Sequence, residues 1–322
     1  MKLTELQKLF VDKSVDNVDK DYKRAEEELK EIYSKYSKDQ EKLLNELSRV
    51  LMDYDIKAEY LELTAEEKKK LKNKFQVSIN DMILEEYNND LDQVGNILGS
   101  AAKRTYLYQE YLLSIGIDFK LKPLPVETIK KIINKAVTEN SGIWSSLIWN
   151  NKKKLATLLK KAIWGLFDGK ESVNSISKKI REAFNVGKYE SERLVRTETA
   201  KVQQNTINEV AEKHDLKYQL FIATLDGRTS EQCREYDGET FSTENPNKPT
   251  VPVHPNCRSV MSNIPSKDYK PDTRKNHITK EIEPYKTYQD WYKENKDLVQ
   301  EQEKIIKEVA RLRAEKKKKR KN

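Results

Sequence analysis

The chain has 322 residues, of which 36% are hydrophobic and 35% are charged, and its net charge is +8. Globular domains usually carry about 25% charged residues, so this composition predicts a thin core and elongated helical parts. Two cysteines exclude a disulfide-rich secreted scaffold, and the charged opening segment excludes a signal peptide. No stretch approaches the roughly 18 apolar residues of a membrane helix. We therefore expect a soluble protein, with no membrane partner, made in a cytosol.

Residues 1–118 are predicted to form a helical arm of three or four long helices, packed as a hairpin or bundle. Neither glycine nor proline occurs before Gly95, which favours uninterrupted helix. Thr64 and Glu67 have the spacing of a capping box, so a new helix is expected to start there. Asp39 and Gln40 interrupt a heptad seam in the first part of this arm, and a second apolar stripe follows them. Such a seam is typical of a core and less often of a partner-binding face. The seam consists of Val15, Val18, Tyr22, Ala25, Leu29, Ile32 and Tyr36.

Residues 119–125 are predicted to be a linker, because "KLKPLP" contains two prolines, and Pro125 suits the start of the next helix. Helices are expected over residues 126–214, with breaks at Asp168-Gly169 and near Gly187. The segment "RTETAKVQQN" in the last of them is polar almost all round. That pattern indicates either burial against polar partners or a position at a surface.

Residues 216–265 are predicted to form a small α+β part with short antiparallel strands. "KYQLFIATL" alternates like a strand, a short helix is expected over 229–236, and Asp237-Gly238 is typical of a turn before a second strand. Four prolines spaced by three predict a polyproline II run at the surface. "CRSVMSNI" then resembles a returning strand. Together with the preceding helices, this part gives one module over residues 126–265.

Residues 266–322 are predicted to be helical with a basic end. Residues 301–322 hold ten Lys or Arg and four Glu, a local charge of +6. Such a tail either attracts the phosphate backbone of DNA or is a solvated, disordered end. The expected fold class is therefore mainly α with a small α+β module, running from an N-terminal helical hairpin or bundle to a basic C-terminal helix. The candidate DNA-binding residues are Arg311, Arg313, Lys316, Lys317, Lys318, Lys319, Arg320 and Lys321.

Three scarce residues, Cys233, His254 and Cys257, make a candidate metal set. Their side chains suit zinc, and two ligands three residues apart on a tight turn can reach one ion. Two alternatives stay open: small buried thiols, or a disulfide, which a cytosol disfavours and an extracellular particle permits. A fourth ligand would come from water or from one of Asp226, Asp237 and His277.

Catalytic motifs are missing from the sequence. It contains no HExxH, no GxSxG and no Walker loop. A Cys–His nucleophile pair would need an orienting third group, and the spacing indicates none. We therefore expect a protein that is not an enzyme.

Five short elements occur in one order within residues 140–262: an "RTE" helix, a "D-x-R-T" turn, a cysteine, a "DG" turn and a closing "HPNCR". This order resembles the phage minor head protein family, also called head morphogenesis or Mu F-like proteins. Ser259 departs from the family's usual final cysteine. The residues that match the family's motifs are Arg196, Thr197, Glu198, Asp226, Arg228, Thr229, Cys233, Asp237, Gly238, His254, Pro255, Cys257 and Arg258.

The resemblance implies a structural component of a tailed-phage virion, in the head interior or at the portal vertex, made in the cytoplasm of a bacterial host. Its partners would be the portal protein, the capsid or scaffold interior, and phage DNA through the basic tail, and some members leave with the genome. Arg196 and Arg228 are expected to pair with Glu198 and Asp226 to hold the module together. Two other hypotheses stay open: a zinc-stabilised DNA-binding or nuclease-like effector carried in the particle, and a coiled-coil adaptor without a DNA role.

Overall fold

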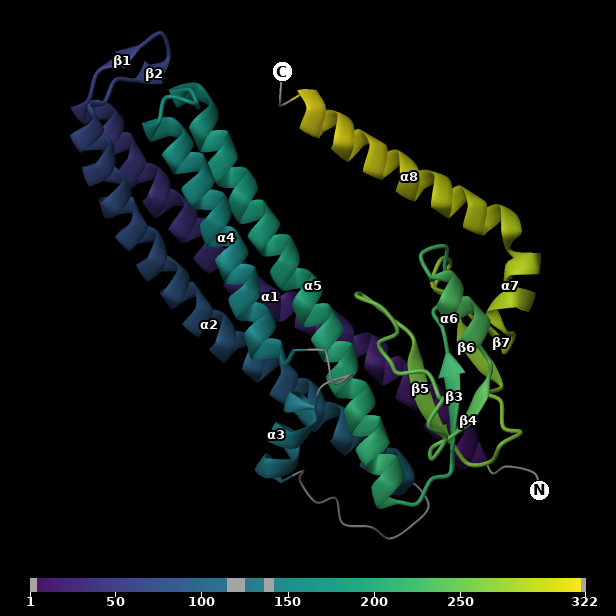
Figure 1. The fold of residues 1–322 in the computed structure, drawn as a ribbon. Helices are drawn as coiled ribbons and strands as arrows, with labels where there is room; N and C mark the ends of the chain where they lie inside the picture. The colour runs from purple at the N-terminus through teal and green to yellow at the C-terminus, as the bar shows by residue number, and fades with distance from the viewer. Residues whose placement is uncertain (1–4, 115–124, 136–141, 320–322) are drawn as a thin grey trace. The chain divides into compact units, whose positions relative to one another are not determined.

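A computed structural model describes residues 5–114, 125–135 and 142–319 of the chain. These residues are mostly helical, with a few short antiparallel strands, which confirms the expected fold class (Figure 1). Contacts group them into two compact units. The helical unit comprises residues 22–101 and 133–199, and the strand-containing unit comprises residues 1–21, 102–132 and 200–322. The predicted domain boundaries stay a prediction, and most of the predicted linker lies outside the described residues.

The N-terminal part is a hairpin of two very long helices, α1 (Glu5–Asp53) and α2 (Ala65–Ser114), rather than three or four. A small antiparallel pair, β1 (Ile56–Lys57) and β2 (Tyr60–Leu61), joins them. The expected capping box starts α2, because the Glu67 carboxylate accepts from the backbone N–H of Thr64 at 2.8 Å and from its hydroxyl at 2.7 Å.

Asp39, where the apolar seam is interrupted, does not end α1, and the helix continues through it. Asp39 is buried, and its carboxylate accepts a hydrogen bond from Lys35 one turn earlier at 3.2 Å. This local partner lets a charged residue sit in the seam without ending the helix. Ala25, Leu29, Ile32 and Tyr36 of the seam are buried core residues, as predicted, whereas the side chains of Val15, Val18 and Tyr22 lie outside the described set.

In the helical unit, α1 and α2 pack beside α4 (Trp144–Phe167) and the first part of α5 (Val173–Lys213) (Figure 1). Lys152 of α4 is buried at the centre of this packing. Its ammonium donates to Glu86 at 3.0 Å and to the Tyr36 hydroxyl at 2.8 Å, and lies 2.8 Å from the Asp90 carboxylate. One buried cation therefore holds three of the four helices together.

The predicted break near Gly187 is wrong, because α5 is one continuous helix. A Cβ atom on Gly187 would lie 2.8 Å from the ring of Tyr36 and 3.4 Å from Leu155. The glycine is thus needed for close packing between helices, and it does not act as a breaker. The other expected helix limits are confirmed: α3 (Val126–Asn134) begins after Pro125, and α4 ends before Asp168-Gly169.

The strand-containing unit is built on a three-stranded antiparallel sheet in the order β4-β3-β5 (Figure 1). Its strands are β3 (Tyr218–Ile222), β4 (Thr240–Ser242) and β5 (Val260–Ile264), close to the expected positions. One face packs on α5, through a cluster of Ile207, Leu220, Ile222, Val260, Ile264 and Tyr269. The other face covers a second cluster, which consists of Phe221, Ala223, Cys233, Val251, Cys257 and Met261.

The proline-rich run between β4 and β5 does not form the predicted surface polyproline helix. It folds into turns and bends, and Val251 and Pro252 are buried. The reason is that Val251 belongs to the apolar cluster beneath the sheet, so the chain turns inward to place it there. The spacing of the prolines could not predict that Val251 packs into this cluster.

The C-terminal part contains elements that the sequence patterns did not indicate. A short antiparallel pair, β6 (Thr273–Lys275) and β7 (Ile282–Pro284), follows the sheet. The expected helix after Pro284 is two helices, α7 (Tyr288–Glu294) and α8 (Lys296–Lys319). No helix in the described part of the chain is both long and apolar enough to cross a membrane.

Candidate functional site

The "D-x-R-T" turn is organised around the carboxylate of Asp226, which is buried just after β3. It accepts two hydrogen bonds from the Arg258 guanidinium, at 2.6 and 2.9 Å. It also accepts from the backbone N–H of Arg228 at 3.0 Å and from the Thr229 hydroxyl at 3.2 Å. The expected Arg228–Asp226 ion pair is present at 3.5 Å, but Arg258 is the closer partner. The "HPNCR" element therefore closes on the "D-x-R-T" turn through this arginine.

The ionisation of Asp226 is controlled by this pairing. Burial alone would raise its pKa, but the hydrogen bonds and positive charge of Arg258 outweigh burial, and the pKa lies below its ordinary value. The group therefore stays a carboxylate at neutral pH, as a two-pronged guanidinium contact requires.

The "DG" turn is organised around a second buried carboxylate, that of Asp237. It accepts from the backbone N–H of Ala223 at 2.7 Å and from Arg274 at 2.8 and 3.1 Å. Gly238 follows with a φ of +83°, a conformation that favours glycine. Sequence reasoning missed Arg274, which lies on β6, beyond the predicted module. No local pattern around "TRK" marks it as a partner.

The "RTE" element lies on α5 within the helical unit. Arg196 forms an ion pair with Glu192 one turn earlier, and the Thr197 hydroxyl donates to the carbonyl of Arg193 at 2.8 Å. Glu198 is buried. This ion pair of Arg196 thus runs along its own helix, and the expected pairing of Arg196 with Glu198 stays a prediction.

The polar stretch that follows on α5 is buried against polar partners, which confirms one of the two expected readings. The side-chain amide of Gln204 accepts from the backbone N–H of Met261 at 2.9 Å and donates to its carbonyl at 3.1 Å. Asn263 donates to the carbonyl of Ile207 at 3.0 Å and bonds the buried amide of Gln219 at 2.9 Å. These amides join the helix to the sheet.

The two cysteines and His254 come together beneath the sheet. Cys233 lies in the first turn of α6 (Glu231–Tyr236), where its N–H donates to the N-cap hydroxyl of Ser230 at 3.3 Å. Its Sγ atom lies 3.4 Å from Nε2 of His254 and 3.8 Å from Sγ of Cys257. All three ligand atoms lie within 4.8 Å of one another, so the three residues expected to be close in space are close.

A tight turn shapes the "HPNC" part of this cluster. The N–H of Cys257 donates to the carbonyl of His254 at 3.1 Å, and Asn256 has a φ of +60°. Proline followed by asparagine suits the central positions of such a turn, because proline presets the first φ and asparagine tolerates a positive one. Nδ1 of His254 lies 3.0 Å from the carbonyl of Pro255.

The two thiols are buried and free, and they ionise differently. A hydrogen bond from Cys233, together with bonds from the backbone N–H groups of Ser259 and Val253, lowers the pKa of Cys257 despite its burial. The same hydrogen bond and burial raise the pKa of Cys233. The other residues considered as ligands have different roles: Asp226 and Asp237 bind arginines, and Nδ1 of His277 lies 3.1 Å from the carbonyl of Lys275.

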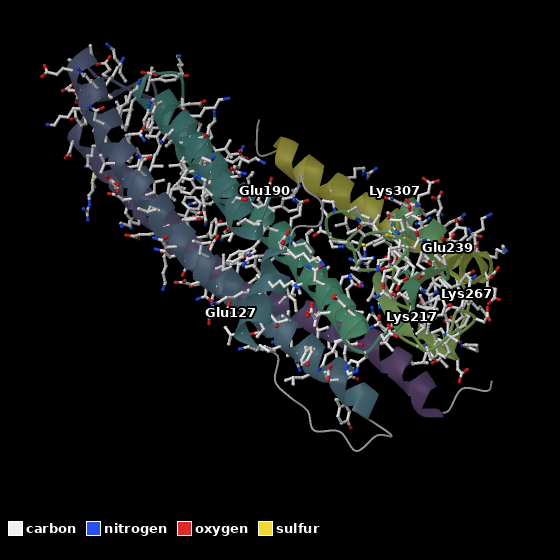
Figure 2. The ribbon with its side chains drawn as sticks, turned by 60° about the horizontal axis from the view of Figure 1, so that its bottom comes forward. Glu127, Glu190, Lys217, Glu239, Lys267 and Lys307 are labelled. Carbon is white, nitrogen blue, oxygen red and sulfur yellow. The ribbon has the colours of Figure 1, made fainter. Side chains whose placement is uncertain are left out.

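The basic C-terminus is helical up to Lys319, rather than a structureless tail. Lys307 lies on this helix (Figure 2), and Arg311 pairs with Glu308 at 3.0 Å. Beyond the charges, α8 exposes an apolar stripe of Ile305, Val309 and Leu312. The side chains of Arg313 and Lys316–Lys319 are not among the described ones, and Arg320 and Lys321 lie outside the described residues.

Comparison with known proteins supports the resemblance found in the motifs. Residues 156–262 match the family model described as Phage Mu protein F like protein. No curated protein and no solved structure matches the chain. The matched segment contains the Asp226 and Asp237 networks up to Arg258 and the whole Cys–His cluster. Over this third of its length the chain is therefore similar to the Phage Mu protein F like family, and this similarity supports a phage head-related protein.

Proposed function

We propose that this chain is a minor head protein of a tailed bacteriophage, which binds the portal vertex or the procapsid interior and contacts the packaged DNA through α8. The observation that carries the proposal is the family match over residues 156–262, a segment that contains the Asp226 network and the Cys–His cluster. The alternative of a DNA-cleaving effector predicts divalent-metal-dependent nicking of plasmid DNA, and we expect none.

The motif residues support a structural role because the fold accounts for them. Asp226 and Asp237 are buried carboxylates, each held by a guanidinium and by backbone N–H groups. Carboxylates bonded in this way connect loops and strands, and their oxygen lone pairs are engaged in these hydrogen bonds. We therefore infer that the residues shared with the family stabilise the fold of this module.

Two features of α8 support its role in contacts with partners. Ile305, Val309 and Leu312 repeat at spacings of four and three, so they form one exposed apolar face. A protein such as the portal would bury this face. The last twelve residues, 311–322, carry eight Lys or Arg and one Glu, a density of charge that suits phosphate backbones.

The test is quantitative mass spectrometry of purified particles, in which filled heads are compared with heads emptied by triggered ejection. The major capsid protein serves as the retained reference. A few copies in filled heads support the proposal: their loss on emptying assigns an ejected protein, and their retention assigns a fixed component of the vertex or shell. Procapsids are measured in the same way, and absence from both filled heads and procapsids overturns the proposal.

A further inference from the structure

We propose that Cys233, His254 and Cys257 form a zinc site with three protein ligands, in which the fourth position is held by water. This site goes beyond the head-assembly role and does not depend on it. The argument rests on four features of the cluster: its distances, the orientation of the imidazole, the rigidity of the two segments that carry the ligands, and the surroundings of the sulfur atoms.

The spacing of the ligand atoms fits a tetrahedral zinc ion. With Zn–S bonds of about 2.3 Å and Zn–N bonds of about 2.0 Å, two sulfur ligands lie about 3.8 Å apart and a sulfur and a nitrogen about 3.5 Å apart. The observed separations are 3.8 Å between the two Sγ atoms and 3.4 Å between Sγ of Cys233 and Nε2 of His254. A disulfide would need the two sulfurs at about 2.05 Å, far closer than they are.

The hydrogen bonding of His254 leaves the correct nitrogen available. A backbone carbonyl can only accept, so the contact of Nδ1 with the carbonyl of Pro255, at 3.0 Å, places the proton of the neutral ring on Nδ1. Nε2 then carries a lone pair, and it is the atom that faces the thiols. An outer hydrogen bond of this kind is what orients histidine ligands in metal sites.

The two chain segments that carry the ligands are already held in place. Cys233 is fixed in the first turn of α6, where Ser230 caps the helix. Cys257 and His254 are the two ends of the "HPNC" turn, closed by the hydrogen bond between them. Ligands held on a helix start and on a tight turn lose little freedom on binding an ion, which favours affinity.

The surroundings of the sulfurs identify where a fourth ligand would stand. The Ser259 hydroxyl hydrogen-bonds the sulfur of Cys233 and is itself buried, so a side chain at position 259 reaches the cluster. A thiol there would complete a set of three sulfurs and one imidazole, a common composition of structural zinc sites. Ser259→Cys is therefore expected to tighten zinc binding rather than disturb it.

The experiment measures metal on the full-length protein, purified under reducing conditions with zinc in the medium. We expect about one zinc per chain by elemental analysis, and cobalt as a probe should give the spectrum of a tetrahedral thiolate site. His254→Gln should lower zinc affinity at least about ten-fold. His277→Gln is the matched control, because this histidine lies outside the cluster, and it should bind as the wild type does.

Three outcomes count against the proposal. The first is a zinc content well below one equivalent in the wild type, whether the thiols are then found free or oxidised to a disulfide. The second is equal zinc affinity in His254→Gln and His277→Gln. The third is an unchanged zinc affinity in a folded Ser259→Cys protein. This variant keeps the test decisive if His254→Gln does not fold.

Discussion

The ring of Tyr36 lies 2.8 Å from the position that a Cβ atom on Gly187 would occupy. The Tyr36 ring cannot easily move away from this position, because the side chain is buried and its hydroxyl is hydrogen-bonded to Lys152 at 2.8 Å and to Ser191 at 2.9 Å. A glycine in the middle of α5 therefore determines how closely α1 and α5 approach each other within the helical unit.

Gly187→Ala is expected to destabilise the protein, although alanine favours helix by about 1 kcal/mol. Overpacking a tight core costs about 1–3 kcal/mol, which exceeds that gain. Chemical denaturation of the wild type and the variant measures the difference. Gly99→Ala on α2 is the control, since its Cβ would meet its nearest neighbour, Ile133, at an ordinary 3.8 Å, and it should be neutral or stabilising. Equal effects of the two substitutions would refute the packing argument.

The buried carboxylate of Glu86 is expected to make the helical unit less stable as pH rises. Burial raises the pKa of Glu86 to about 7, because the attraction of Lys152 offsets the cost of burial only in part. Between its unfolded and folded pKa values the folded state binds the extra proton, so the free energy of unfolding falls with rising pH. From pH 5 to pH 8 this group alone removes about 2–3 kcal/mol.

Glu86→Gln should lose less stability than the wild type between pH 5 and pH 8, measured by urea denaturation at both values. Lys152 keeps Asp90 as a partner at 2.8 Å in this variant. Glu85→Gln, a substitution at the exposed neighbour, is the control and should keep the wild-type pH dependence. Parallel curves for the wild type and Glu86→Gln would show that Glu86 does not titrate in this range.

Asp226→Asn is expected to destabilise the strand-containing unit by about 3 kcal/mol at neutral pH, because it leaves the Arg258 guanidinium without its carboxylate. The pKa of Asp226 is lowered in the folded protein, so the stability it contributes is present above about pH 4 and disappears as pH falls through the folded pKa. The gap between wild type and variant should therefore close in acid.

Thermal unfolding monitored by circular dichroism from pH 2 to pH 7 follows this gap. Asp81→Asn, at an exposed position on α2, should change the free energy of unfolding by less than about 0.5 kcal/mol at every pH. A gap that stays constant down to pH 2 would argue that the ion pair with Arg258 is not the source of the effect.

Deletion of residues 311–322 should abolish a salt-sensitive affinity for DNA. These residues carry eight Lys or Arg. Eight phosphate contacts would give a slope of about −7 for log K against log salt concentration. Fluorescence anisotropy with a duplex of arbitrary sequence measures the slope. Replacing the basic residues 316–321 by glutamine separates charge from length, and unchanged binding in both variants would favour an adaptor without a DNA role.

Local patterns were enough to predict much of the fold. The capping box at Thr64, the strand from Tyr218 and the short helix that holds Cys233 all depend on neighbours a few residues away. The sequence pattern also predicted that Cys233, His254 and Cys257 lie close together, because two of them share one turn. Helix ends were harder to predict, because Gly187 looks like a helix breaker until its close contact with Tyr36 is known.

The pairs that close the module could not be predicted in the same way. Arg258 meets Asp226 across 32 residues of sequence, and Arg274 meets Asp237 across 37. The motif marks Arg258 but not its partner, and nothing in the sequence around Arg274 distinguishes it from basic residues at the surface. Such pairings depend on the return path of the chain, which is a property of the whole sheet rather than of a motif.

The amide of Gln204 has a further consequence for how this protein behaves when crowded. In the described sheet β5 is an outer strand, and the outward N–H and C=O of Met261 would offer a template to a strand from another molecule. Gln204 occupies both groups. Helix α5 thus shields the sheet from β-mediated aggregation at this point, a hazard that rises with concentration.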